Sequence, residues 1–206
     1  MRILAVADTE SKRFYDFYRP GCLDEFDLIL ACGDLSPGYL DFLASMSRVP
    51  VLYVRGNHDD ALLAEPPGGL ECIEDRIFVY RGVRFLGLGG SIRYRNSPCM
   101  FTERQMRRRV LRLLPAILLH GGFDVLVTHA PARHLNDFDN RTHRGFECFN
   151  GLLKRFHPQA FVHGHIHANY GMNIPKYTRH GDTLVVNAFD YAVFEVEGRH
   201  DQTSYQ

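Results

Sequence analysis

The sequence has no excess of charge of either sign and no long apolar run. Lys plus Arg and Asp plus Glu number 24 each among 206 residues, so no broad basic field is available to attract nucleic acid or an anionic membrane. No stretch approaches the roughly 20 apolar residues of a membrane span. The apolar run 2–7 is too short for a signal-peptide core and ends at Asp8. We expect a cytoplasmic protein with a small substrate, no membrane partner and no nucleic-acid partner.

Cysteine is scarce, and the motifs of several hydrolase chemistries are absent. The 5 cysteines form an odd set without C-x-x-C spacing, which disfavours a disulfide framework or a structural zinc knuckle. The motifs G-x-S-x-G, H-E-x-x-H and a Walker loop do not occur, so nothing indicates a serine hydrolase, a zincin or a P-loop enzyme. The chain has no repeat, low-complexity tract or Gly/Ser linker. We therefore expect residues 1–206 to form a single domain.

Apolar runs that end at turn or polar residues predict the strands of an α/β core. These runs are 2–7, 27–32, 49–54, 124–128 and 160–163. Helical i, i+3, i+4 spacing follows Pro37 and recurs over 146–156. The capping box that begins at Thr102 predicts a third helix, with Pro115 as a kink or break. Alternation of strands and helices indicates a partly parallel, buried sheet.

Two later stretches have the pattern of paired antiparallel strands. Residues 76–89 predict two strands around a turn at Gly82, and residues 183–197 predict another such pair, interrupted near 187–190. These strands require a second sheet. The predicted fold is α/β, a four-layer α/β/β/α sandwich of two mixed β-sheets face to face, flanked by helices.

Residue types that bind metal ions stand directly after the apolar runs. They lie in Asp8-Thr9-Glu10, Gly33-Asp34, Gly56-Asn57-His58-Asp59, Thr128-His129 and Gly164-His165-Ile166-His167. The carboxyl ends of parallel strands lie at one edge of a sheet, so these side chains can converge. Carboxylate, amide oxygen and imidazole bind divalent cations, and a carboxylate can bridge two cations about 3.5–4 Å apart. Asp34 is the natural bridge because its strand is expected to be central.

Each of these residues alone has an ordinary structural explanation. An aspartate at a strand end is commonly a turn former or a helix cap, and a single histidine is commonly a core or surface residue. His165 and His167 alternate, so they could point to opposite sides of a strand. The combination is more specific, because Gly-Asn-His-Asp and Gly-His-x-His each follow an apolar run in this order.

With these motifs the chain resembles the calcineurin-like metallophosphoesterases from Asp8 to about Asn187. The stretch 164–171 is most similar to small bacterial phosphoesterases and to metallophosphoesterase-domain phosphodiesterases. The resemblance implies two metal ions that share Asp34. The first would be held by Asp8, Asp34 and His167, and the second by Asp34, Asn57, His129 and His165.

The resemblance also implies a reaction. A hydroxide that bridges two cations would attack a phosphomonoester or phosphodiester in line, and nucleotide-type substrates are included. His58 would contact the phosphate and act as general acid, a role that contributes about 10²–10⁴-fold in rate. Asp59 would orient His58. Monoesters, linear diesters and cyclic nucleotides all stay open as substrates, as does the oligomeric state.

Position 10 departs from the family pattern, which usually has Asp-x-His where this chain has Asp8-Thr9-Glu10. A glutamate ligand adds negative charge and favours harder cations. We therefore expect Mn²⁺, with Fe, Zn, Mg or Ni as alternatives. Glu10 could instead be an acceptor behind the ligands.

Three regions outside the motifs have candidate roles. The segment Arg93-Tyr94-Arg95-Asn96 is a candidate for substrate contact, with Arg93 and Tyr94 as its main members, since a guanidinium fork suits phosphate and a tyrosine ring can stack on a base; a solvated loop is the alternative. The polar loop 133–145 follows His129 and is expected to wall the pocket. The arginines between positions 104 and 112 spread around a predicted helix and are expected to be solvated rather than bound to nucleic acid.

Two other functions fit parts of the pattern. The retromer subunit with this fold serves protein interaction without catalysis, and the missing family histidine at position 10 fits such a metal-binding scaffold. The presence of His58 favours catalysis instead. A nuclease is the other alternative, which the balanced charge disfavours.

Overall fold

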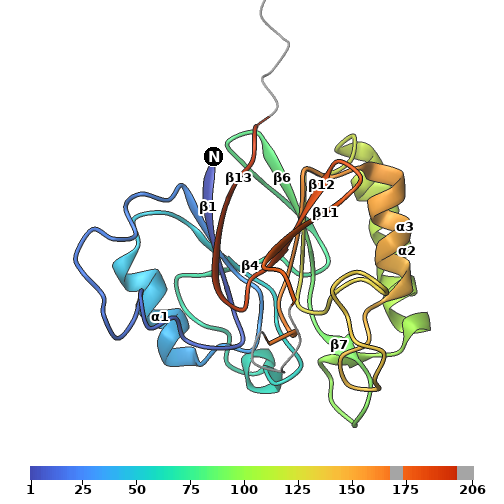
Figure 1. The fold of residues 1–206 in the computed structure, drawn as a ribbon, viewed down its shortest axis with the longest axis horizontal. Coiled ribbons are helices and arrows are strands. Elements are labelled where there is room, and N and C mark those ends of the chain that lie inside the picture. The colour runs from blue at the N-terminus through green and yellow to red at the C-terminus, as the bar shows by residue number, and fades with distance from the viewer. Residues whose placement is uncertain (168–173, 199–206) are drawn as a thin grey trace, which may run out of the picture.

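The computed structural model describes residues 1–167 and 174–198. Two large sheets lie face to face, with α1 on one outer side and α2 and α3 on the other (Figure 1). The first sheet has the order β13-β1-β2-β3-β4, and the second has the order β11-β12-β10-β9-β6-β5. This arrangement confirms the predicted four-layer sandwich.

The elements have the following bounds. The first sheet contains β1 (Arg2–Ala7), β2 (Leu28–Ala31), β3 (Val51–Tyr53), β4 (Glu71–Cys72) and β13 (Asp190–Glu195). The second contains β5 (Ile77–Tyr80), β6 (Val83–Leu88), β9 (Val125–Thr128), β10 (Ala160–His163), β11 (Tyr177–His180) and β12 (Thr183–Asn187). A short parallel pair is formed by β7 (Ser91–Ile92) and β8 (Met100–Phe101). The helices are α1 (Pro37–Met46), the 3₁₀ helix η1 (Asp60–Leu63), α2 (Glu103–Leu119) and α3 (Glu147–Phe156).

Both large sheets are mixed. β1, β2 and β3 run parallel, as do β6, β9, β10 and β12, whereas β13, β5 and β11 are antiparallel to their neighbours. The parallel strands are buried on both faces, which explains why they appear in the sequence as continuous apolar runs. Because β2 is the middle strand of its sheet, the segment that carries Asp34 is central, as predicted.

Three apolar clusters correspond to the three interfaces between layers. The cluster between the sheets contains Ala5 and Leu30 from the first sheet and Phe85 and Val127 from the second. A second cluster packs α2 and α3 on the outer face of the second sheet, and a third packs α1 and the segment 14–26 on the outer face of the first. Burial of apolar area at about 25 cal/mol per Å² stabilises each interface.

α2 begins where its capping box predicts. In α2, Thr102 Oγ1 accepts from the backbone N–H of Gln105, and Gln105 Oε1 accepts from the backbone N–H of Thr102. Of the predicted kink or break at Pro115, the break does not occur, because α2 continues to Leu119. Proline leaves the carbonyl of Leu111 without its helical partner, and Leu111 is 54% exposed, so water can reach that turn. Within the described residues, no helix is long and apolar enough to cross a membrane.

The strands of 183–197 do not pair with each other, which corrects the predicted hairpin. β12 pairs with β10, whereas β13 pairs with β1 in the other sheet. The two residues between them make the crossing, since Ala188 donates to the carbonyl of His163 at 2.7 Å and Phe189 bridges to Ala7. A period-two pattern marks a strand but does not name its partner.

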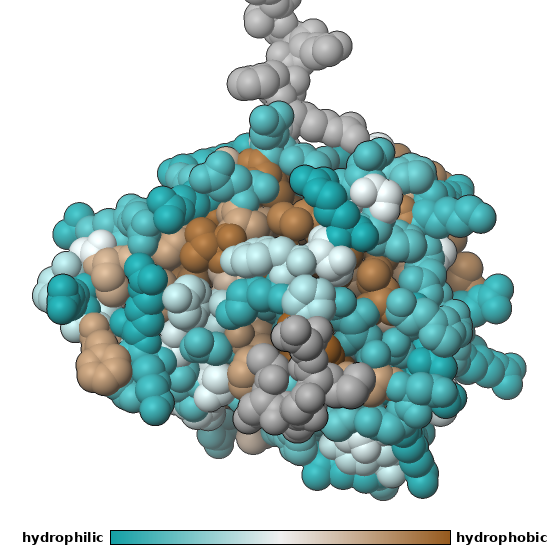
Figure 2. Space-filling view, viewed as in Figure 1, coloured by the Kyte–Doolittle hydropathy of each residue, from teal (hydrophilic) through white to brown (hydrophobic). Residues whose placement is uncertain are grey.

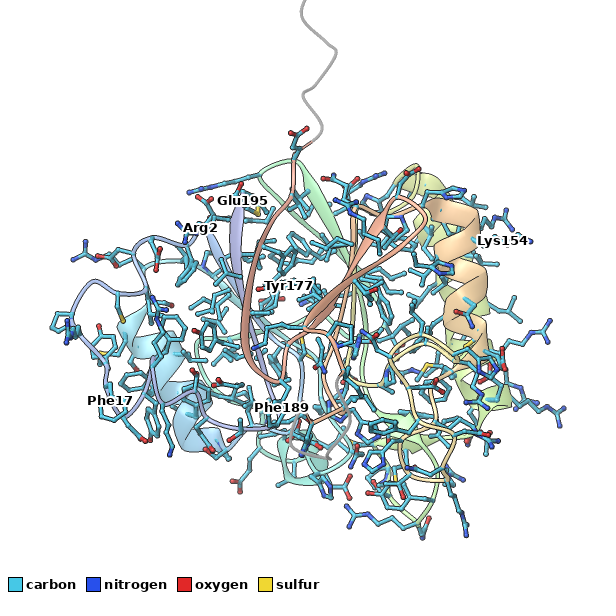
Figure 3. The ribbon with its side chains drawn as sticks, in the orientation of Figure 1. Arg2, Phe17, Lys154, Tyr177, Phe189 and Glu195 are labelled. Carbon is cyan, nitrogen blue, oxygen red and sulfur yellow. The ribbon has the colours of Figure 1, made fainter. Side chains whose placement is uncertain are left out.

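The free edges of the two sheets are tied together next to this crossing. The hydroxyl of Tyr177 in β11 accepts from the N–H of Val193 in β13 and lies 3.0 Å from the carbonyl of the same residue (Figure 3). In Figure 2 this face is largely hydrophilic, with apolar side chains visible in the upper centre of the view. Phe189 lies below Tyr177 in Figure 3, toward the end of the sandwich where the metal-binding motifs gather.

Candidate metal centre

The motif segments meet at one end of the sandwich, where the carboxyl ends of β1, β2, β3, β9 and β10 lie. They enclose a cavity of about 240 Å³. Its lining residues are Asp8, Asp34, Asn57, His58, Tyr94, Thr142, His143, His165 and His167. His129 is fully buried and lies against Asp34 and Asn57. The structure thus brings together the predicted metal-ligand residues with the exception of Glu10.

Three of these residues have backbone conformations that are unusual for non-glycine residues. The φ angles of Asp8, Asp34 and His165 are 67°, 55° and 67°, in the left-handed region that side chains with a Cβ disfavour. Neighbouring loops hold these conformations in place: Asp8 donates from its N–H to the carbonyl of Gly33, and His165 donates to the carboxylate of Asp8 at 2.8 Å. Backbone strain of this kind is typical of functional sites.

Glycine is required where the loops after β2 and β3 touch. A Cβ on Gly56 would lie 2.1 Å from Oδ1 of Asp34, and a Cβ on Gly33 would lie 2.4 Å from the nitrogen of Gly56. The close approach lets the N–H of His58 donate to Oδ1 of Asp34 at 2.7 Å. The two glycines therefore set the position of the Asp34 carboxylate.

Asp59 stabilises the same two loops rather than orienting His58. Its Oδ2 accepts from the backbone N–H of Asp34 at 2.8 Å and from that of Gly56 at 2.7 Å. Burial raises the pKa of Asp59, and the nearby charge of Asp34 adds to that rise. The ring of His58 has a different neighbour, since its Nδ1 lies 3.2 Å from Nη2 of Arg95.

The ring of His129 is fixed by a backbone carbonyl. Its Nδ1 lies 2.9 Å from the carbonyl oxygen of Cys32, so Nδ1 carries a proton and donates. In the neutral ring Nε2 then bears a lone pair. Nε2 lies 3.0 Å from Oδ1 of Asn57 and 3.3 Å from Oδ2 of Asp34, which are both acceptors. Three electron-pair donors thus converge on one point, an arrangement that a cation satisfies.

Without a metal ion, a proton satisfies that arrangement. Burial alone would lower the pKa of His129, but the adjacent Asp34 carboxylate outweighs it and raises the pKa to about 10. Burial alone would raise the pKa of Asp34, and His129 and His58 reverse the effect, so that this pKa lies below its usual range. The amide of Asn57 has its Oδ1 directed at His129, while its Nδ2 donates to the hydroxyl of Tyr94 at 3.3 Å.

His165 is fixed in the same manner through its other nitrogen. Its Nε2 lies 2.9 Å from the carbonyl of Thr142, so Nε2–H donates and Nδ1 keeps a free lone pair. Burial lowers the pKa of His165 to about 3, which keeps the ring neutral and able to ligate. Ligand atoms of Asp34, His129 and His165 all lie within 4.8 Å of one another. Metal-ligating histidines are commonly held by a carbonyl on the second nitrogen, so this donor set fits a divalent cation.

Asp8 and His167 form the other part of the cavity. Nε2 of His167 lies 3.4 Å from Oδ1 of Asp8, whose side chain is 1% exposed. The ring of His167 stacks on Phe189, with 4.8 Å between centroids and 26° between planes. Phe189 belongs to the crossing between the sheets, so the packing of the fold orients this imidazole.

Glu10 and Arg93 are not among the residues that line the cavity, and the roles predicted for them stay predictions. The hydroxyl of Ser36 hydrogen-bonds the Glu10 carboxylate and lowers its pKa, and Ser36 also caps α1 by accepting from the N–H of Tyr39. The guanidinium of Arg93 donates to the carbonyl of Met100 at 3.0 Å through Nη2. Arg93 thus has a hydrogen-bond partner outside the cavity.

The sequence analysis assigned no individual role to Thr142 or His143. Thr142 and His143 belong to the loop 133–145, which lines the cavity as expected, although no single residue of it was selected. That loop is held by Asp137, which accepts from the N–H of Gly145 at 2.9 Å and from Arg133 at 2.8 Å. The only signal in the sequence was the position of the loop directly after His129. Residues 168–171 of the predicted motif region lie outside the described residues.

Comparisons with known proteins agree with this geometry. The family described as "Calcineurin-like phosphoesterase" matches residues 1–169. The chain belongs to this family. Its members bind divalent metal ions in a dinuclear site and are typically phosphoesterases, although some are not catalytic.

Solved structures support the fold of this family member. The protein TT1561 of Thermus thermophilus is 16% identical, with a TM-score of 0.61 over 92% of this chain and 89% of that one. A hypothetical protein from Thermus thermophilus is 21% identical, with a TM-score of 0.51 over 91% of this chain and 75% of that one. A search of curated proteins found no match.

Proposed function

We propose that this chain is a metal-dependent phosphoesterase that hydrolyses phosphomonoesters or phosphodiesters, nucleotide types included, at a centre of two divalent cations. The observation that carries the proposal is the convergence of three acceptors. Nε2 of His129 lies 3.0 Å from Oδ1 of Asn57 and 3.3 Å from Oδ2 of Asp34, with the proton of His129 committed to Cys32. With a neutral His129 ring these acceptors are unsatisfied, so either a cation or a proton on Nε2 must lie between them.

In this proposal the ligands form two sets that share one carboxylate. Asp34 would bridge the cations, with Asp8 and His167 on the first and with Asn57, His129 and His165 on the second. When bound, the two cations supply Lewis acidity and an activated water for attack on phosphorus. Asp34 is able to bridge because Oδ1 accepts one hydrogen bond, from the N–H of His58, and keeps a second lone pair, while Oδ2 faces His129.

His58 is placed to act on the substrate rather than on a cation. It lines the cavity and is exposed, whereas His129 and His165 are buried behind it. A side chain at this mouth would meet the phosphoryl oxygens and the leaving oxygen, and it would donate from Nε2, because Nδ1 faces Arg95. Tyr94 and the loop residues Thr142 and His143 form the remaining walls, which limit access of water to the reacting atoms.

The ligand set bears on the choice of cation. The proposed ligands include three imidazoles, those of His129, His165 and His167, and two carboxylates, those of Asp8 and Asp34. Imidazole nitrogen suits Fe²⁺, Ni²⁺ and Zn²⁺, whereas carboxylate and amide oxygens suit Mn²⁺ and Mg²⁺. Mn²⁺ remains the proposed cation, because its hard character suits Asp8, Asp34 and the amide oxygen of Asn57.

The proposal is tested with metal-free protein prepared by chelation. The metal-free protein is assayed with 4-nitrophenyl phosphate as the monoester and bis(4-nitrophenyl) phosphate as the diester, alone and with Mn²⁺, Zn²⁺, Ni²⁺, Fe²⁺ or Mg²⁺. We expect no turnover without a cation and turnover of at least one ester with Mn²⁺. Absence of turnover with every cation, while two cations bind per chain, would favour a metal-binding scaffold.

A further inference from the structure

The imidazole of His58 has an arginine as its neighbour where an acid was expected. Nη2 of Arg95 lies 3.2 Å from Nδ1 of His58 and 3.2 Å from the carbonyl oxygen of Asn57. A guanidinium can only donate hydrogen bonds. Nδ1 must therefore accept, and the neutral ring carries its proton on Nε2.

The carboxylate of Asp59 makes no hydrogen bond to His58 in the structure. It is buried, at 7% exposure, and its Oδ2 already accepts from the backbone N–H groups of Asp34 and Gly56. An acid paired with His58 would require the opposite ring proton, on Nδ1. If Arg95 is the partner of His58, the neutral ring carries its proton on Nε2; if Asp59 were the partner, the proton would be on Nδ1. The two forms can be distinguished by spectroscopy.

The segment that carries Arg95 is anchored on both sides. Before it, the hydroxyl of Tyr94 accepts from Nδ2 of Asn57 at 3.3 Å. After it, the hydroxyl of Ser97 donates to Oδ1 of Asp60 at 2.7 Å and accepts from the N–H of Cys99. These bonds link the segment to residues on both sides of His58 in the chain, so the guanidinium and the ring are held by one network.

We propose that Arg95 is a positioning residue that orients His58 and presents its Nε2–H to the phosphoryl group of the substrate. The guanidinium holds the ring by donating to Nδ1 and holds the loop by donating to the carbonyl of Asn57. Arg95 acts through His58 and needs no contact with the substrate for this effect. Its consequence for turnover rests on the proposed phosphoesterase function, whereas the state of the ring does not.

The state of the ring is measured on the metal-free protein labelled with ¹⁵N-histidine. Long-range ¹H–¹⁵N correlation spectra distinguish a ring protonated on Nε2 from one protonated on Nδ1. We expect His58 to carry its neutral-state proton on Nε2 in the wild type and in Arg95→Lys, whose ammonium can also donate. The Nδ1–H form in the wild type would overturn the proposal.

Turnover is measured on the same proteins after metal loading. Arg95→Ala should lower kcat about 10-fold or more with KM and metal content nearly unchanged, because a loosely held ring spends less time in the productive orientation. Arg95→Lys should recover part of kcat. Arg104→Ala, which removes an exposed arginine of α2 far from the cavity, is the matched control and should match the wild type.

The outcomes separate this proposal from the proposed function. A raised KM with unchanged kcat in Arg95→Ala would make Arg95 a substrate-binding residue and overturn the positioning role. Equal kcat and KM in wild type and Arg95→Ala would overturn it as well. If the wild type hydrolyses neither reporter with any cation, the phosphoesterase function fails, and the ring state of His58 alone still decides whether Arg95 orients it.

Discussion

His129 and Asn57 face each other through two acceptor atoms, with 3.0 Å between Nε2 and Oδ1. The carbonyl of Cys32 accepts a hydrogen bond from Nδ1–H of the imidazole, and the hydroxyl of Tyr94 accepts one from the side-chain amide of Asn57. Both side chains are thereby held with a lone pair toward the same point, next to Oδ2 of Asp34. A cation or a proton must occupy that point, and the two compete.

This competition predicts that metal binding releases a proton. The pKa of His129 is raised to about 10 in the metal-free protein, so the ring is charged at pH 8 and must lose one proton when a cation binds. The affinity of this site should therefore rise about 10-fold per pH unit between pH 7 and 9. Calorimetric titration in buffers of different ionisation enthalpy measures the released proton. A pH-independent affinity would contradict the pairing.

The same pKa has a consequence for the stability of the metal-free protein. Because the folded pKa of His129 lies above its usual value of 6.5, the pair with Asp34 stabilises the fold fully below that value and loses its effect as the pH rises through about 10. The Tm of the metal-free protein should fall over that range more steeply than the Tm of the metal-loaded protein. Parallel curves for the two forms would count against this explanation.

His58→Gln should separate turnover from metal binding. His58 lines the cavity, but its side chain is not among the converging ligand atoms. We expect kcat to fall roughly 10²-fold with metal content retained. Metal content and kcat for one ester are measured for the wild type and for His58→Gln. His120→Gln, at the exposed end of α2, is the control. Loss of metal together with turnover would place His58 among the ligands.

Tyr94→Phe should weaken the second cation without removing it. The substitution removes only the hydroxyl that accepts from Asn57 Nδ2, so the amide is free to rotate its Oδ1 away from the cation. Partners of metal ligands contribute about 10-fold or more to affinity, and we expect a rise in the Kd of that order. Tyr15→Phe, a partly exposed tyrosine in the layer that covers α1, should leave the Kd unchanged.

Glu10→Gln should change neither metal stoichiometry nor the ranking of cations. The Glu10 carboxylate accepts from Ser36 and does not line the cavity, so its charge is not part of the ligand set. Asp8→Asn provides the contrast, because Asp8 lies 3.4 Å from His167 and receives the N–H of His165. Selective loss of the first cation in Glu10→Gln would show that Glu10 is a ligand of that cation.

The sequence predicts where the site lies because it depends on strand ends. Asp8, Asp34 and His129 each follow a buried parallel strand, and the parallel arrangement alone brings those ends together. Gly33 and Gly56 flank the same positions because the loops approach too closely for a Cβ. Residue type and position after a strand therefore carry most of the information.

The sequence does not predict in which direction an individual side chain points. Asp59 and Arg93 have the right chemistry and position, yet Asp59 binds two backbone N–H groups and Arg93 binds the carbonyl of Met100. Such choices depend on a few tenths of an ångström and on competing partners of about 1 kcal/mol each. The partners of β12 and β13 were missed for a related reason, since strand pairing depends on contacts far apart in the chain.

The central claim, that Asp34 bridges two cations used for phosphoester hydrolysis, is tested most directly by Asp34→Asn. Asparagine has the same shape and tolerates the left-handed backbone of position 34, so the fold should persist. Metal analysis and ester hydrolysis are measured on the wild type and on this variant. We predict two cations per chain and turnover in the wild type, with fewer cations and no turnover in Asp34→Asn. Two cations and wild-type turnover in a folded Asp34→Asn protein would contradict the dinuclear centre.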